Sequence, residues 1–234
     1  MKEKTRDRFE SMIEEVGGVL GVDKEAAFNS LILMMGHLLF GYAVDPVPAE
    51  KRKIVELNAN VAVGLVLEHY YIDHKETDIF NTLAREFYPG IMRQSDIYLN
   101  AATVIGEVID KIYGAGGNVN IIAPNAGTGT VIMIARRFLE SDFGLPSKLT
   151  KEIRYIGYVE NSIYKAMYLM NMMFSIPEMV EKFMIGKALE VAGEERLLRL
   201  YRKLAGTDSR YVCIIDEGKM IGDNSMIVTD RRAR

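Results

Sequence analysis

The chain has 234 residues, of which 49% are hydrophobic and 26% charged. These proportions are those of an ordinary globular protein with enough chain for a proper core, and they exclude disordered and fibrous classes. A formal net charge of -3 gives no overall signature of nucleic-acid binding. Cys213 is the single cysteine, which excludes an internal disulfide and a cysteine-based zinc site and fits a cytoplasmic protein. The many ionic residues and the lack of tryptophan hint at a heat-adapted source.

The N-terminal part reads as helical. Its charged first residues, which include acids, do not resemble a secretory signal. An amphipathic pattern predicts a first helix that stops at Gly17-Gly18, and Asp23 is placed to cap the second. We expect helices over residues 2–16, 24–42, 49–72 and 76–87, and therefore a helical region over residues 1–93.

The second predicted helix is unusually apolar. Residues 26–44 carry no acidic or basic side chain apart from His37, over about the length of a membrane span. Because the run also contains Asn29, Ser30 and two glycines, we interpret it as a buried core or interface helix and consider a membrane unlikely. Its apolar part, residues 31–42, could form the interface of a homo-oligomer.

Acidic and histidine residues cluster where the third predicted helix ends. Glu68, His69, Asp73 and His74 lie close in sequence, and His69 and Asp73 share a helix face. A metal site needs three or four convergent ligands, and no other ligand is near in sequence. We therefore favour an ordinary solvated helix end and predict no metal.

A strand, a glycine loop and a helix follow in the middle of the chain. A helix is expected over residues 101–113, followed by a strand over 119–122 and another helix over 131–139. Between this strand and the 131–139 helix lie Gly127 and Gly129, which can adopt positive φ and let a ligand approach the backbone. The unsatisfied N–H groups at the start of the helix favour polar or anionic groups. This pattern is typical of a nucleotide-type cradle.

Strands and helices alternate from there on. We expect strands over 153–160, 182–185 and 211–215, helices over 162–173 and 188–204, and a hairpin over 220–229. This alternation predicts an α/β region over residues 94–234 with a parallel, doubly wound sheet. Four methionines of the 162–173 helix are interpreted as flexible core filling: Met167, Met170, Met172 and Met173.

The glycine loop fits neither of two common nucleotide signatures. A dinucleotide fingerprint needs a third glycine where Ile132 stands, and a phosphate loop needs Gly-Lys-Ser/Thr, which is absent. Glu160, however, ends the next predicted strand about thirty residues later, where a sheet of this class can place a carboxylate over ribose hydroxyls.

On these residues the chain resembles the Rossmann-like methyltransferases that use S-adenosylmethionine, and especially the modification subunit of type I restriction systems. Their first signature, Asp-Pro-x-x-Gly-x-Gly-Gly/Thr, is matched by Ala123-Pro124-Asn125-Ala126-Gly127-Thr128-Gly129-Thr130. Their second, a strand ending Gly-x-Glu and a helix with Ala-x-x-Asn-Met, is similar to Gly157-Tyr-Val-Glu160 and to Ala166 with Asn171-Met172. The likeness covers about residues 95–190.

The resemblance implies S-adenosylmethionine as cofactor and DNA or a partner subunit as partner. The cofactor residues that it implies are Ala123, Pro124, Asn125, Gly127, Gly129 and Glu160. The catalytic loop of the family, Asn/Asp/Ser-Pro-Pro-Tyr/Phe after the fourth strand, would correspond to Asp216-Glu-Gly-Lys219, with Asp216 as the candidate catalytic residue.

Four departures from the family pattern keep a second hypothesis open. Leu99-Asn100 replaces Thr-Pro, Ala123 replaces the first acid, Gly186-Lys187 replaces a third-strand Gly-Asp, and the prolines and ring of the catalytic loop are missing. The alternative is a non-catalytic binding or assembly protein that keeps the fold. A basic patch for nucleic acid could come from Arg196, Arg199, Arg202, Lys203 and the chain end, although a solvated helix face is the ordinary explanation.

Overall fold

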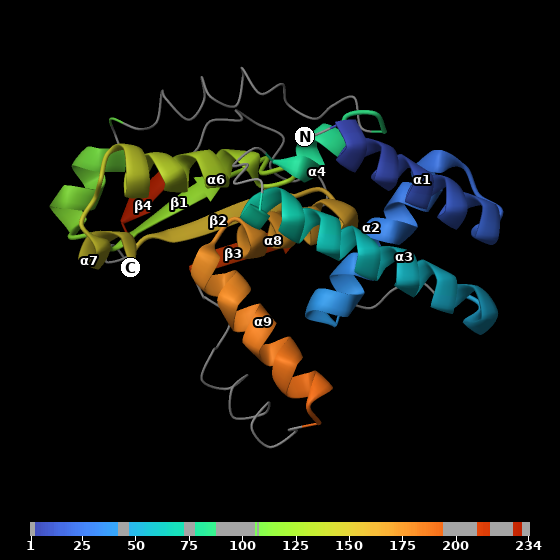
Figure 1. Cartoon of the computed structure of the whole chain (residues 1–234). Coiled ribbons are helices and arrows are strands. Elements are labelled where there is room, and N and C mark those ends of the chain that lie inside the picture. The colour runs from blue at the N-terminus through green and yellow to red at the C-terminus, as the bar shows by residue number, and fades with distance from the viewer. Residues whose placement is uncertain are drawn as a thin grey trace.

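The described residues form a mostly helical structure with one small sheet (Figure 1). The computed structural model describes residues 3–41, 47–72, 78–87, 106, 108–193, 210–215 and 227–230. The sheet has the order β3-β2-β1-β4. Its strands are β1 (Val119–Ala123), β2 (Arg154–Val159), β3 (Tyr211–Ile215) and β4 (Ile227–Asp230). The first three run parallel, as the alternating pattern predicts, whereas β4 pairs antiparallel with β1.

The described N-terminal residues are helical. They form α1 (Glu3–Leu20), α2 (Lys24–Phe40), α3 (Ala49–Leu67), a π-helical turn η1 (Glu68–Ile72) and α4 (Ile79–Ala84). Asp23 caps α2 as predicted, with its Oδ1 accepting from the Ala26 N–H at 2.9 Å. Helix α2 packs against α1, α3 and α8, and Leu31, Ile32 and Met35 are fully buried. These contacts explain the apolar sequence of α2 within one chain, and an oligomer remains a prediction.

Helix α1 is longer than predicted, because it continues through Gly17-Gly18 to Leu20. A side chain at Gly17 would come within 3.2 Å of the Val22 carbonyl and 3.4 Å of Ala27. Gly17 therefore permits the close approach of α1 to the start of α2 rather than a helix stop. The chain turns at Gly21, where φ is +74° and the N–H donates to the Gly17 carbonyl.

The helices after β1 are α6 (Thr130–Arg137), the π-helical turn η2 (Phe138–Asp142), α7 (Ser147–Thr150), α8 (Ser162–Phe174) and α9 (Pro177–Val191). The connections from β1 to β2 and from β2 to β3 cross the sheet in the same direction, so right-handed crossovers place both on one face. Consistent with this, α6 packs against α8.

The strand predicted over residues 182–185 is wrong, because these residues lie within α9. A short apolar run does not distinguish strand from helix, and Pro177 at the first helical position is the signal that favours a helix. Figure 1 shows α9 extending away from the sheet. Its exposed apolar residues include Met184, Ile185 and Val191.

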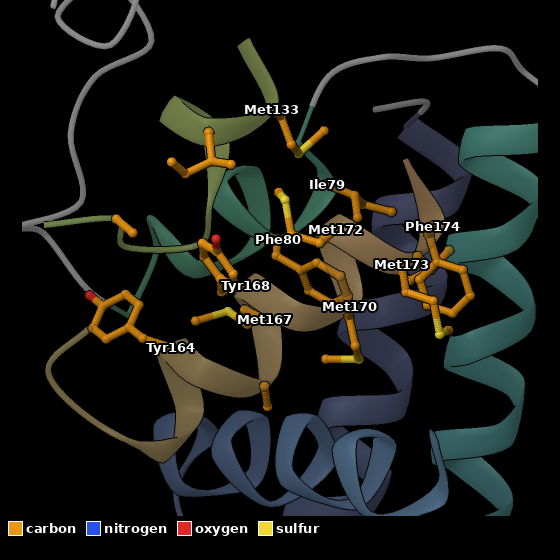
Figure 2. Close-up of a cluster of buried hydrophobic side chains, with 14 of the residues drawn as sticks. Ile79, Phe80, Met133, Tyr164, Met167, Tyr168, Met170, Met172, Met173 and Phe174 are labelled. Atoms are coloured by element: carbon orange, nitrogen blue, oxygen red, sulfur yellow. The ribbon is translucent and has the colours of Figure 1, made fainter. Parts of the chain in front are cut away.

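One core joins the helical region to the sheet. Helix α8 lies between α2 and the strands β2 and β3. The four methionines predicted as core filling are buried, with at most 6% of any of them exposed. Figure 2 shows these side chains spread around α8, among Ile79 and Phe80 of α4 and Met133 of α6. They fill the irregular space between three elements, a role for which methionine is suited.

Several predictions fall outside the described residues. These are the boundary at 93/94, the start of the 101–113 helix, the basic residues Arg196 to Lys203, Asp216 and the turn of the 220–229 hairpin. The described residues contain no helix with the length and apolarity needed to cross a membrane.

Candidate functional site

The glycine loop leaves the carboxyl end of β1 and is held against β2. Ala126 donates its N–H to the Tyr158 carbonyl at 2.9 Å, and Gly129 donates to the Ala126 carbonyl at 2.7 Å. Gly127 and Gly129 have φ of +50° and +92°, a region that favours glycine. Helix α6 then starts at Thr130 without a side-chain cap. The predicted strand, loop and helix are therefore present.

The two loop glycines have different surroundings. A Cβ on Gly129 would lie 3.0 Å from the ring of Tyr168 and 3.2 Å from Met172, so Gly129 lets the loop pack on α8. A Cβ on Gly127 would have no atom within 4 Å. Of the pair, Gly127 is thus the residue at which a ligand has room to approach the backbone.

The other predicted cofactor residues also divide into inner and outer groups. Ala123 and Pro124 are buried, so their side chains shape the loop from within. Asn125 is exposed, and Gly127 is half-buried. Only the outer residues can meet a ligand directly.

Glu160 joins the outer group at the same edge of the sheet. Strands β1 and β2 are parallel and Ala123 is paired with Gly157, so the glycine loop after Ala123 and the residues after Val159 leave the sheet at the same edge. Glu160 is exposed. The next residue, Asn161, caps α8 and accepts from the N–H groups of Ile163 and Tyr164, both at 3.0 Å. Asn125, Gly127 and Glu160 therefore share one edge, as the sequence predicts.

Asp216 follows β3, which pairs with β2 and has Ile215 opposite Val159. Among the described strands β3 is the third parallel strand, whereas the catalytic loop of the family would follow the fourth. Because Gly186 lies in α9, the comparison of Gly186-Lys187 with a third-strand Gly-Asp is wrong. Asp216 follows β3 directly in sequence and lies outside the described residues.

A buried carboxylate that the sequence does not single out lies behind the loop. Asp78 caps α4, and its Oδ1 accepts from the Asn81 N–H at 2.9 Å. Its Oδ2 accepts from the hydroxyls of Thr128 and Thr130. Asp78 is 6% exposed. The only local signal for it is that of a helix cap, because its partners on the loop are fifty residues away.

Asn171 completes this network from α8. Its amide donates to Asp78 Oδ1 at 2.7 Å and to the Thr128 carbonyl at 2.6 Å. Its Oδ1 accepts from the Tyr70 hydroxyl of η1 at 2.7 Å. Asn171 is fully buried, and each of its polar atoms is paired. The asparagine of the second signature thus fastens the loop from inside.

Burial dominates the electrostatics of the network. Desolvation raises the pKa of the Asp78 carboxyl, against the lowering effect of hydrogen bonds from Thr128, Thr130, Asn81 and Asn171. Burial, followed by the nearby Asp78 charge, raises the pKa of Tyr70 well above 10.0. The Tyr70 hydroxyl is therefore a neutral donor at any physiological pH.

The acidic and histidine cluster at the end of α3 lies only partly within the described residues. The described residues contain no group of three His, Cys, Asp or Glu that could hold a metal ion. His69 is buried, against the expectation of a solvated helix end, and packs edge-on against the ring of Tyr70 with centroids 5.1 Å apart. Asp73 and His74 lie outside the described residues.

Comparison of the chain with protein-family models, with curated proteins and with solved structures finds no match in any of the three.

Proposed function

We propose that the chain is a Rossmann-like S-adenosylmethionine-dependent methyltransferase, or a degenerate relative of one, that binds this cofactor at the edge formed by Gly127 and Glu160. The observation that carries the proposal is their juxtaposition. An open glycine with positive φ follows β1, and an exposed carboxylate follows the adjacent parallel strand. In open α/β sheets, ligands bind outside the carboxyl ends of such strands.

The chemistry of an adenosyl ligand fits this pair. The Glu160 carboxylate can accept hydrogen bonds from two neighbouring ribose hydroxyls, and bonds of this kind to a charged acceptor contribute about 1.5–3 kcal/mol. The absent side chain at Gly127 leaves room for the rest of the ligand to lie on the loop. The first N–H groups of α6 have no intrahelical acceptor and can bind a polar ligand group.

The sheet order supports the same proposal. The spatial order β3-β2-β1 is the strand order expected of one half of a doubly wound sheet. The antiparallel β4 beside β1 departs from the fully parallel arrangement. We propose DNA as the partner on the strength of the family resemblance, with an exocyclic amine as the methyl acceptor.

The alternative is a scaffold that keeps the fold for binding or assembly. It is favoured by the inward direction of the loop threonines, whose hydroxyls are both used by Asp78. The missing acid at Ala123 and the missing catalytic prolines point the same way. The two functions differ in whether methyl groups are transferred.

Cofactor binding is tested by calorimetric titration and thermal shift with S-adenosylmethionine. Wild type should bind, and Gly127→Ala should bind at least tenfold more weakly because its methyl group fills the open position. Gly144→Ala is the matched control, since Gly144 has φ of +69° and no atom within 4 Å of a built Cβ, yet follows η2 and not a sheet strand. If Gly127→Ala and Gly144→Ala bind with equal affinity, any loss of affinity relative to wild type comes from backbone strain and not from the filled position at Gly127.

A second pair of variants tests the carboxylate. Glu160→Gln should weaken binding by about tenfold or more, the equivalent of at least 1.4 kcal/mol. Glu152→Gln is the control, because Glu152 lies just before the amino end of β2, and this variant should bind as tightly as wild type. No heat and no thermal shift of wild type at millimolar ligand would reject the cofactor. Transfer of labelled methyl to DNA, RNA or protein then separates enzyme from scaffold, and a null result with all three favours the scaffold.

A further inference from the structure

The carboxylate of Asp78 connects the helical region to the two threonines that flank Gly129. Thr128 lies between the two glycines, and Thr130 is the first residue of α6. Both donate their hydroxyls to Asp78, and the two hydroxyls also lie 3.1 Å apart. The second half of the loop is therefore fastened to a residue that precedes α4, fifty residues earlier in the chain.

The hydrogen bonds to this carboxylate come from neutral groups. Within the part of the chain that the structure describes, four donors reach Asp78: two hydroxyls, one backbone N–H and one side-chain amide. None of these four donors is a Lys or an Arg. A buried polar network that is fully satisfied is rigid and specifies one arrangement. The loop is thus fixed with positive φ at both glycines before any ligand arrives.

We propose that Asp78 is a positioning residue for the candidate cofactor site, which holds the glycine loop in its ligand-binding conformation and couples the affinity of that site to the docking of α4 and η1. This inference rests on the proposed function. A loop that is already ordered loses less entropy when it binds, which raises affinity. Coupling is reciprocal, so ligand should also stabilise α4 and η1.

Asp78→Asn is the sharpest perturbation, because it keeps the shape and replaces one acceptor oxygen by an amide. Asp23→Asn is the matched control. Both aspartates cap a helix and accept from the N–H three residues later at 2.9 Å, but Asp23 is exposed and caps α2. The two variants therefore make the same chemical change at the same kind of cap.

The first measurement is hydrogen exchange of the ligand-free protein. The hydrogen-bonded amides of the loop and the first turn of α6 are those of Ala126, Gly129 and Met133. Asp78→Asn should speed exchange of these amides at least tenfold, whereas Asp23→Asn should leave them unchanged. If Asp78→Asn does not fold, Thr130→Val removes a single donor and should give a smaller increase at the same amides. Wild-type exchange at these amides in a folded variant would overturn the proposal.

The second measurement uses S-adenosylmethionine as the probe. Asp78→Asn should bind at least tenfold more weakly than wild type, whereas Asp23→Asn should bind as tightly as wild type. In wild type the ligand should slow exchange of the amides of α4. Wild-type affinity of Asp78→Asn, or exchange of α4 that does not change when ligand binds to wild type, would overturn the coupling.

The two proposals fail in different ways. If wild type does not bind S-adenosylmethionine, the proposed function fails, and the exchange of the ligand-free loop still decides whether Asp78 positions it. If wild type binds and Asp78→Asn binds equally, the proposed function stands and the positioning role is rejected.

Discussion

Gly157→Ala tests the packing that supports the candidate site. A Cβ on Gly157 would lie 2.5 Å from Tyr168 Cε2 and 2.9 Å from the Cβ of Ala126. The first contact is against the ring of a fully buried tyrosine on α8, and the second is against the glycine loop. Neither neighbour can withdraw without moving α8 or the loop.

The expected loss follows from two opposing terms. Overpacking in a close-packed core costs about 1–3 kcal/mol. Replacing glycine by alanine also restricts the unfolded chain, which returns about 0.4–1 kcal/mol. We therefore expect Gly157→Ala to lower the free energy of unfolding by about 1–2 kcal/mol. Tyr168→Leu should relieve part of this loss, with a coupling on the order of 1 kcal/mol in a double-mutant cycle.

The change in the free energy of unfolding is measured by urea unfolding that is monitored by circular dichroism. Gly64→Ala is the control. Gly64 lies inside α3 with no atom within 4 Å of a built Cβ. The same substitution should there stabilise the protein by about 0.5–1 kcal/mol, because alanine favours a helix. If Gly157→Ala is as stable as wild type with an unchanged denaturant slope, the close contact between α8 and β2 is refuted.

Two further predictions concern ionisable groups. Burial raises the pKa of the Cys213 thiol from its ordinary 9.0 to about 12. Alkylation by iodoacetamide at pH 8 should thus be about 10³-fold slower in the native protein than in the urea-unfolded chain, and similar rates would refute the burial of the Cys213 thiol. Asp78 has a folded pKa above its ordinary 3.8, so its stabilising contribution is complete below that pH and is lost as the pH rises through the folded value. The free energy of unfolding of wild type, minus that of Asp78→Asn, should therefore fall as the pH rises from about 4; a flat difference or a rise would contradict the shift.

Features set by neighbouring residues could be predicted from the sequence. The cap at Asp23, the strand before the glycines and the buried methionines of α8 all follow from patterns within one turn or one strand. The position of Glu160 beside the loop also follows, because successive parallel strands end at one edge. Each of these inferences needs only local periodicity and the rules of parallel sheets.

Predictions failed where tertiary contacts decide between two local possibilities. Gly17 looks like a helix stop but serves the contact between α1 and α2. The run at residues 182–185 fits a strand or a helix equally well by pattern, and α9 shows which one forms. The loop glycines look equivalent, yet only Gly129 lies against α8. These outcomes depend on which residues of other helices and strands pack against the segment, and the sequence of the segment alone does not specify them.

Asp78 shows most clearly why the site could not be completed from sequence. It meets Thr128 and Asn171 across separations of 50 and 93 residues. An asparagine would cap α4 equally well without a buried charge, so the carboxylate costs stability that a cap alone does not require. A polar network that is retained at such a cost is expected where a conformation must be fixed for function. The same comparison separates the two functions: in a ligand-binding protein, Asp78→Asn should weaken S-adenosylmethionine binding, whereas a pure scaffold should show only the change in stability.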